Sequence, residues 1–197
     1  MISIIIPTLN ESKIDFKLDK GINAELIIID SKKGIKGRAL QMNFGAKLAK
    51  GDILMFLHAD TKLPKDWHKL VNNSLKQNDY GCFKKKFDSN KFLFRVIELG
   101  SYTKTLLLKE VLGDNTLFIK KKLFEEINGF KNIELMEDVE ISRRLRKYKM
   151  DIVKEKVISS SRRFEKNGII KTILLMQKLR LLYLLGVPPK KLEKMYK

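Results

Sequence analysis

A histidine, a carboxylate and a hydroxyl follow an uncharged apolar run in the first third of the chain. The run covers 53–57, and His58, Ala59 and Asp60 come directly after it. A hard divalent cation that holds a diphosphate needs only one or two protein carboxylates, because phosphate oxygens and water complete its coordination. Asp60 suits that role, although Asp-Thr before Leu-Pro is also ordinary turn composition. Three roles are open for His58: a second metal ligand, a hydrogen-bond partner, or a buried neutral side chain.

A second acidic pair, Glu137 and Asp138, opens a predicted helix whose later turns carry arginines. Carboxylates in a first helical turn are favoured by the helix dipole and need no function. The same dipole fixes the position of a carboxylate, and a fixed carboxylate can accept a proton from a hydroxyl group. Asp138 is therefore a candidate general base, with a capping role as the alternative.

Basic residues are numerous and unevenly distributed. The formal charge is +18, and residues 142–197 hold 17 Lys or Arg against 4 acidic residues. Arg162 and Arg163 follow the last predicted strand and offer forked donors for a diphosphate. The charge predicts an anionic partner, and a nucleic acid, an acidic membrane face and a phosphorylated substrate all satisfy it.

Length and composition favour one globular domain. The chain has 197 residues, 44% of them hydrophobic, and 4 prolines, which argues against disorder. A single cysteine, Cys82, cannot form an internal disulfide, so we expect a reducing, cytoplasmic location. The start, "MISIIIPTLNES", lacks the basic leader of a signal peptide, and we expect a first strand there.

The elements that must position these residues form an α/β pattern. Apolar runs at 2–6, 26–29 and 53–57 predict buried parallel strands. The segment 38–50 places Ala39, Met42, Ala46 and Ala49 on one helical face. Open α/β sheets bind ligands outside the carboxyl ends of their strands, which is where Asp60 falls.

The second half of the chain gives a less regular pattern. We expect a helical segment interrupted near Gly100 and a short helix stopped by Gly129. The segment 80–112 has no chemical interpretation from sequence and is expected to hold variable acceptor loops. The further predicted elements are the helical segment 91–112, a strand at 115–119, a helix at 137–149 and a strand at 157–160.

The segment 169–185 is apolar but contains Lys171, Lys178 and Arg180 without a clean polar face. It is too short and too charged for a confident membrane span. Lysines beside Leu and Tyr suit a helix that lies on a bilayer surface. A helix packed on the domain with solvated lysines is an equally good interpretation.

The order and spacing of several motifs resemble the family 2 glycosyltransferases. These motifs are "SIIIPTLNE", "LIIID", "GRALQMNFGAKLAKGDILMFLHADTKLP", "GDNTLFIKK" and "GFKNIELMEDVEISRRLRK". "FLHADT", "LMEDVEISRRLR" and "RRFEKNG...TILLMQKLRLLYLLGV" resemble the radical-SAM/selenodomain-associated transferase 2 subgroup. The resemblance implies an α/β fold, a single-domain open and mostly parallel sheet of the glycosyltransferase A (nucleotide-diphosphosugar transferase, Rossmann-like) type, with a C-terminal helical segment.

The resemblance also implies a donor site for a nucleotide-diphosphosugar. Asp30 matches the carboxylate that pairs with the base. Asp60 matches the last carboxylate of the Asp-x-Asp metal motif, which holds manganese or magnesium, and His58 takes its first position. The donor-binding residues implied by the family are Pro7, Thr8, Asn10, Glu11, Asp30, Arg38, Asn43, His58, Ala59, Arg162 and Arg163.

On the acceptor side, Asp138 matches the general base of inverting members, with Glu137 beside it as a second catalytic residue. Gly113 and Asp114 are expected to line the acceptor side. The resemblance divides the chain 1–197 into a donor nucleotide and metal half (1–64), an acceptor half (65–164) and basic apolar C-terminal helices (165–197). One departure from the family is a short donor region, because only seven residues separate Asp30 from Arg38.

Two functions of different classes follow. The first is an inverting, metal-dependent glycosyltransferase that acts on an unknown acceptor hydroxyl. The alternative is a non-catalytic protein, derived from such an enzyme, that binds a phosphometabolite or an anionic membrane surface through residues 165–197 at the inner face of the cytoplasmic membrane. Nucleic acid is disfavoured as a partner because no recognition motif is present. Nucleotidyl transfer lacks the Gly-rich signature expected after the first strand.

Overall fold

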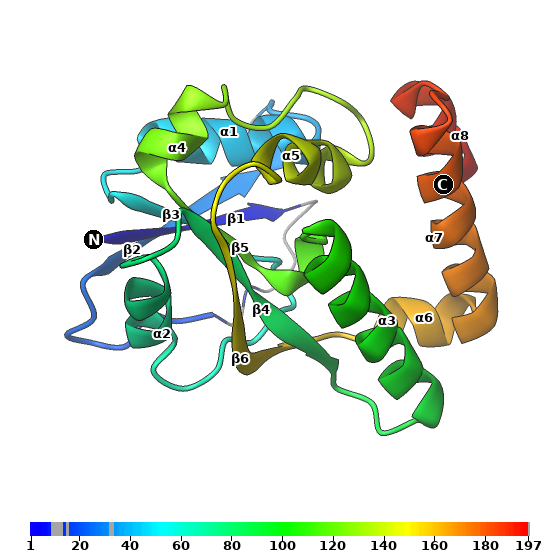
Figure 1. The fold of residues 1–197 in the computed structure, drawn as a ribbon, viewed down its shortest axis with the longest axis horizontal. Helices are drawn as coiled ribbons and strands as arrows, with labels where there is room; N and C mark the ends of the chain where they lie inside the picture. The colour runs from blue at the N-terminus through cyan, green and yellow to red at the C-terminus, as the bar shows by residue number, and fades with distance from the viewer. Residues whose placement is uncertain (9–13, 15, 32–33, 197) are drawn as a thin grey trace.

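A central sheet runs through the protein in the computed structural model, which describes residues 1–8, 14, 16–31 and 34–196 (Figure 1). Within these ranges six strands pair in the order β2-β1-β3-β5-β4-β6. The strands are β1 (Ile2–Thr8), β2 (Ala24–Asp30), β3 (Ile53–Phe56), β4 (Tyr80–Phe87), β5 (Leu117–Lys120) and β6 (Met150–Ser159).

Helices cover both faces of this sheet. Figure 1 shows α1, α4 and α5 on one face and α2 on the other. The helices are α1 (Arg38–Leu48), α2 (Trp67–Ser74), α3 (Phe92–Leu108), α4 (Lys121–Glu126), α5 (Glu137–Leu145), α6 (Arg162–Asn167), α7 (Ile169–Leu184) and α8 (Pro189–Tyr196), with the short 3-10 helix η2 (Gly113–Asn115) before β5.

Strand β1 is mostly apolar, as expected of a strand that is buried on both faces. Ile5 packs into the cluster under α1, α4 and α5, whereas Ile4 and Ile6 pack into the cluster over α2, as the alternation of side chains along a strand requires. Helix α1 lies so close to β1 that a Cβ at Gly45 would meet Ile5 Cγ2 at 2.5 Å. The expected inward face of this helix is confirmed by its buried Ala and Met side chains.

The sheet is mixed and mostly parallel, as expected. β1 is parallel to β2 and to β3, and β6 is parallel to β4. β5 runs antiparallel to both of its neighbours. The carboxyl ends of β1, β2 and β3 therefore meet at one edge of the sheet, which is the edge predicted to carry the site.

The second half of the chain differs from the sequence-based expectation. The region 80–112, which was expected to hold loops, contains strand β4 and the continuous helix α3, which runs through Gly100 without a break. Gly100 is exposed, so a missing side chain there leaves no gap in the core. Strand β6 begins at Met150 rather than at Val157 and pairs along the whole length of β4.

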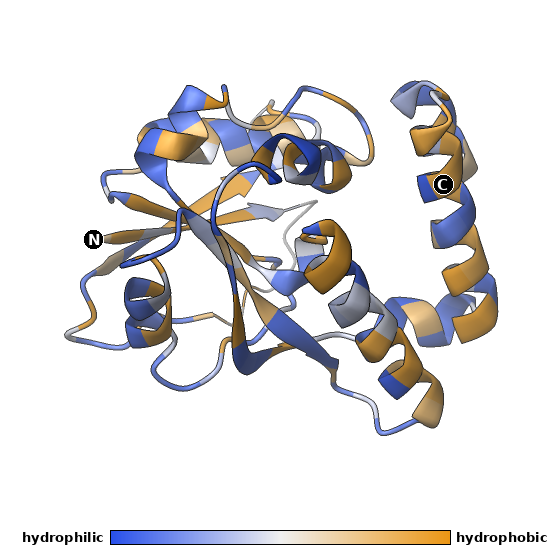
Figure 2. Cartoon of the chain, in the orientation of Figure 1, coloured by the Kyte–Doolittle hydropathy of each residue, from blue (hydrophilic) through white to orange (hydrophobic). Residues whose placement is uncertain are grey.

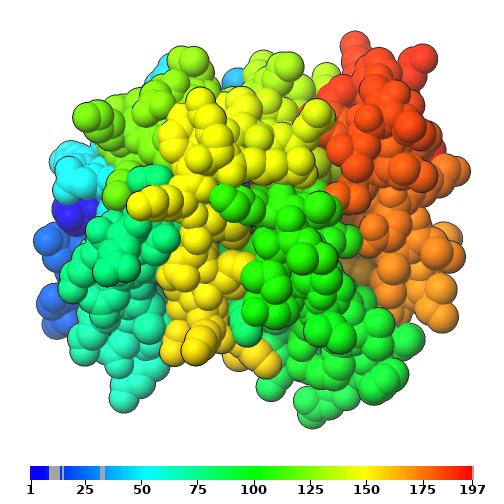
Figure 3. All heavy atoms as spheres, in the orientation of Figure 1, coloured from blue at the N-terminus to red at the C-terminus, as the bar shows by residue number. Residues whose placement is uncertain are grey.

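The C-terminal helices form one side of the molecule next to α3, as the space-filling view shows (Figure 3). A small cluster of Met136, Val139, Leu179 and Leu192 joins the start of α5 to α7 and α8. Over the part of the chain that the structure describes, no helix is both long and apolar enough to cross a membrane.

Candidate functional site

A cleft of about 980 Å³ opens at the carboxyl ends of β1 and β3. It brings together residues from strand ends, from the first turn of α1 and from the start of α6. The predicted donor residues that line it are Pro7, Thr8, Arg38, His58, Ala59 and Asp60. Arg162, the first residue of α6, also lines the cleft.

Gln41 fixes the strand ends beneath the cleft. Its Nε2 donates to the carbonyl oxygens of Thr8 at 2.8 Å and Ile29 at 3.0 Å, so one amide joins β1, β2 and α1. The side chain is buried and lines the cleft. Sequence reasoning missed Gln41, because at 100° per residue it falls outside the helical face formed by Ala39, Met42, Ala46 and Ala49. Asp30 is paired in register with Thr8 but does not line the cleft.

Arg38 connects the cleft to the start of α5. Its guanidinium contacts His58 Nε2 and lies 3.3 Å from Glu137 Oε1. Gly113 packs directly against this pair, because a Cβ there would overlap Arg38 Nη2 and lie 2.9 Å from His58 Nε2. Residues far apart in the sequence are therefore in contact at this point.

His58 is neutral in this environment. Burial and the neighbouring Arg38 charge lower the pKa of His58 to about 3. Arg38 can only donate, so the geometry assigns Nε2 of His58 as the acceptor. That nitrogen is already engaged, which makes it a poor metal ligand.

Asp138 is held by two backbone amides. Gly113 N donates to its Oδ2 at 3.0 Å and Val139 N donates to its Oδ1 at 2.8 Å. Burial and the adjacent Glu137 charge raise the pKa of Asp138 to about 6, although Arg38 and the two amides oppose the shift. Asp138 does not line the cleft itself and is connected to it through Gly113 and Arg38.

Asp114 forms an ion pair with the buried Lys85 beside the site. Its Oδ2 accepts a hydrogen bond from Lys85 Nζ at 2.7 Å. Burial raises the pKa of Asp114, but the Lys85 charge and hydrogen bond outweigh it, and the net shift is downward. Asp114 and Lys85 thus anchor η2 to β4 next to His58.

Two further predicted donor residues, Asn43 and Arg163, do not line the cleft. Asn43 exchanges two hydrogen bonds with the backbone of Phe130, at 2.8 and 2.9 Å, and lines a separate hollow of about 800 Å³ between α1 and α4. Arg163 stacks on the ring of Tyr196, with its Cζ 4.0 Å from the ring centroid. Asn10 and Glu11 lie outside the described residues.

The sequence profile described as Glycosyl transferase family 2 matches residues 18–127, which is more than half of the chain. The chain belongs to this family. No curated protein matches it. Solved structures of S. aureus TarS are similar: one is 15% identical with a TM-score of 0.55, and the alignment covers 81% of this chain and 36% of that chain.

The TarS fragment 1–349 is 17% identical with a TM-score of 0.55, over 81% of this chain and 60% of that one. The same fragment in complex with UDP-GlcNAc is 14% identical with a TM-score of 0.54, over 81% and 58%. This chain therefore spans between about a third and three fifths of these relatives. The likeness confirms the glycosyltransferase A fold.

The donor atoms of this family 2 chain suit a cation that arrives with a diphosphate. Asp60 is exposed and lines the cleft, whereas His58 Nε2 already accepts a hydrogen bond from Arg38. Among the residues that the structure describes, no group of three His, Cys, Asp or Glu is placed to hold a metal ion. One carboxylate is sufficient where phosphate oxygens and water supply the remaining ligands.

Proposed function

We propose that this chain transfers a sugar from a nucleotide-diphosphosugar to an acceptor hydroxyl, with inversion at the anomeric carbon. The observation that carries the proposal is the contact of Arg38 with both His58 and Glu137. It links a cleft at the strand ends to a carboxylate pair at the start of α5. Similarity to TarS, a structure solved with UDP-GlcNAc and with UDP, supports a nucleotide-sugar donor.

The leaving group is a diphosphate, and the walls of the cleft are suited to it. Lys17, Lys62, Lys65 and Arg162 line the cleft and supply positive charge where negative charge develops. A manganese or magnesium ion held by Asp60 would neutralise the same diphosphate. Thr8, which ends β1 and lines the cleft, would orient the nucleoside. Asp30, beside Thr8 in register, would contact the base only where the nucleoside extends beyond the cleft.

Asp138 would accept the proton of the attacking hydroxyl. A carboxyl group with a pKa of about 6 is mostly ionised at neutral pH and is a stronger base than an ordinary aspartate. The Gly113 amide fixes one of its oxygens. Glu137 would hold Arg38 in place and contribute to the raised pKa of Asp138.

Incubation of the purified protein with a panel of nucleotide sugars, manganese and candidate acceptors, followed by mass spectrometry, tests the activity. Asp138→Asn should lower kcat by about 10²- to 10⁴-fold while calorimetry shows unchanged donor binding. Asp52→Asn is the control, because the Asp52 side chain is 91% exposed, pairs with the N-terminal amine and does not line the cleft. Full activity in the Asp138→Asn variant would exclude Asp138 as the base.

The alternative is a non-catalytic protein that keeps the cleft for an anionic ligand. The short donor region between β2 and α1 favours it. Calorimetry with nucleotide sugars separates the two, because an enzyme must bind at least one donor. The subgroup likeness, a cytoplasmic location and the division of the chain at residues 64 and 164 belong to the same proposal.

A further inference from the structure

Helix α3 exposes an apolar face to solvent. Phe92 is 77% exposed, Leu99 is 66% exposed and Leu107 is 73% exposed, and Val96 and Leu106 lie between them. At 3.6 residues per turn these five side chains fall within an arc of about 100°. An apolar stripe of this kind normally packs on a core, so its exposure marks an interaction surface.

Helix α7 repeats the pattern. Ile170, Leu174, Leu181, Leu184 and Leu185 are all exposed, the last at the C-cap, and they too share an arc of about 100°. Its opposite side is packed, with Leu179 fully buried against α5 and α8. Figure 2 shows hydrophobic residues along much of both helices.

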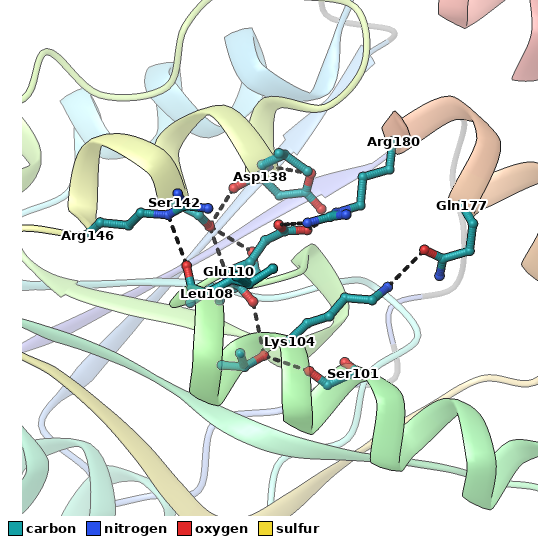
Figure 4. Close-up of polar contacts among 12 residues, drawn as sticks. Ser101, Lys104, Leu108, Glu110, Asp138, Ser142, Arg146, Gln177 and Arg180 are labelled. Atoms are coloured by element: carbon teal, nitrogen blue, oxygen red, sulfur yellow. Dashed lines mark hydrogen bonds and ion pairs between the residues drawn. The ribbon is translucent and has the colours of Figure 1, made fainter. Parts of the chain in front are cut away.

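The two stripes are neighbours. Lys104 Nζ of α3 donates to Gln177 Oε1 of α7 at 3.2 Å, and Figure 4 shows this contact reaching from one helix to the other. Lys104 borders the α3 stripe and Gln177 lies within the α7 stripe. The space-filling view shows the two helices side by side on one face (Figure 3). We call the ten exposed residues of the two stripes the α3–α7 surface.

Positive charges border this surface. Lys171 and Lys178 are exposed beside the α7 stripe, and the sequence of α7 contains no Asp or Glu. The acidic residue of α3, Glu98, is turned inward, where it accepts hydrogen bonds from Phe87 N and Arg95. The chain as a whole carries +18. Two copies meeting through this surface would bring like charges together, whereas an anionic surface would neutralise them.

We propose that the α3–α7 surface binds an anionic phospholipid bilayer. The leucines and Phe92 would enter the boundary between headgroups and acyl chains, and the bordering lysines would contact the phosphates. Helix α3, which the sequence did not single out, would contact the bilayer together with the C-terminal helix α7. It does not depend on glycosyl transfer.

Flotation with phosphatidylcholine vesicles, with and without phosphatidylglycerol, tests the proposal. The wild-type chain should float with the phosphatidylglycerol vesicles and be released by high salt. Leu99→Glu/Leu107→Glu should lower the bound fraction about tenfold, because each change places a carboxylate in the bilayer interface. Leu48→Glu on α1 is the matched control, since Leu48 is 51% exposed but lies outside the surface.

Equal flotation of the double variant and the wild type would overturn the proposal. A wild-type chain that stays in the bottom fraction of the gradient at all salt concentrations would also overturn it. Light scattering after size-exclusion chromatography tests the rival interpretation, in which a second copy of the chain binds the α3–α7 surface. A wild-type dimer that becomes a monomer in Leu99→Glu/Leu107→Glu, without vesicle binding, would assign the surface to a second copy. Donor binding measured without vesicles reports on the proposed enzyme separately.

Discussion

The two sides of the candidate site are built in different ways. Thr8 is the last residue of β1, and His58 and Asp60 come shortly after β3, so the register of parallel strands places them at one edge. Gly113 and Asp138 come from irregular and helical segments that no strand pairing places. The strand side depends on local pattern, whereas the helical side depends on a few long-range polar contacts and should be more sensitive to single substitutions.

Those contacts hold the segment 110–113 between α3, α5 and α7 (Figure 4). Glu110 receives two hydrogen bonds at 2.6 Å from Arg180 of α7. Ser142 Oγ of α5 accepts a hydrogen bond from Val111 N at 2.9 Å and donates to Asp138 O at 2.6 Å. The position of the Gly113 amide against Asp138 therefore depends on α5 and α7 together.

The strongest test of this difference is Arg180→Met. Glu110 is 1% exposed, so loss of Arg180 leaves a buried carboxylate without its partner and should cost about 3–5 kcal/mol in the free energy of unfolding. Urea denaturation measures this cost. Arg163→Met is the control, because its stacking on Tyr196 is worth about 1 kcal/mol or less. Equal losses in the two variants would show that the Arg180–Glu110 pair does not stabilise the helical side of the site.

The pH dependence of stability gives the next largest effect. The pKa of Asp138 is raised to about 6 from 3.8, so the folded protein holds this proton more tightly than the unfolded chain. The resulting stability is fully present below pH 4 and is lost as the pH rises through 6, by at most about 3 kcal/mol.

Asp138→Asn cannot titrate, so its stability relative to the wild type should improve between pH 4 and pH 7.5. Urea denaturation of both chains across this range measures the difference. Parallel curves for the two chains would mean that Asp138 titrates normally. For the proposed enzyme, kcat/KM should rise with a midpoint near pH 6.

Gly113→Ala should damage the site with little effect on stability. The new methyl group would occupy the place of Arg38 Nη2 and displace the guanidinium from His58. A misplacement of this size should reduce kcat/KM by about 100-fold. Gly100→Ala is the matched control, because a Cβ at that helical glycine meets no atom within 4 Å among the described residues. Similar losses in both variants would exclude the close approach as the cause.

The smallest effect separates the adjacent arginines. Arg162 lines the cleft whereas Arg163 contacts Tyr196, although the sequence predicts both to bind the diphosphate. Arg162→Gln should weaken the binding of a nucleoside diphosphate such as UDP by about tenfold. Arg163→Gln should leave it within about twofold. Calorimetry compares them, and a reversed order would contradict the placement of α6.

The first strands and α1 are readable from sequence because their burial is encoded locally. A run such as Ile2–Ile6 has no polar side chain except Ser3, so a buried strand is the obvious interpretation. Strand β4 was not predicted from the sequence, because Lys84, Lys85 and Lys86 interrupt its apolar pattern. Lys85 is buried in that strand only because Asp114, from a distant segment, pairs with it.

The sequence by itself determined the α/β pattern, the family and the placement of Asp60 after a buried strand, because these depend on neighbours along the chain. Only the tertiary structure decided that Arg38 contacts both His58 and Glu137. It alone also decided that Asn43 hydrogen-bonds with the backbone of Phe130 and that α3 and α7 present adjoining apolar faces. Contacts between residues distant in sequence depend on how helices pack on the sheet, and one sequence read in order does not carry that information.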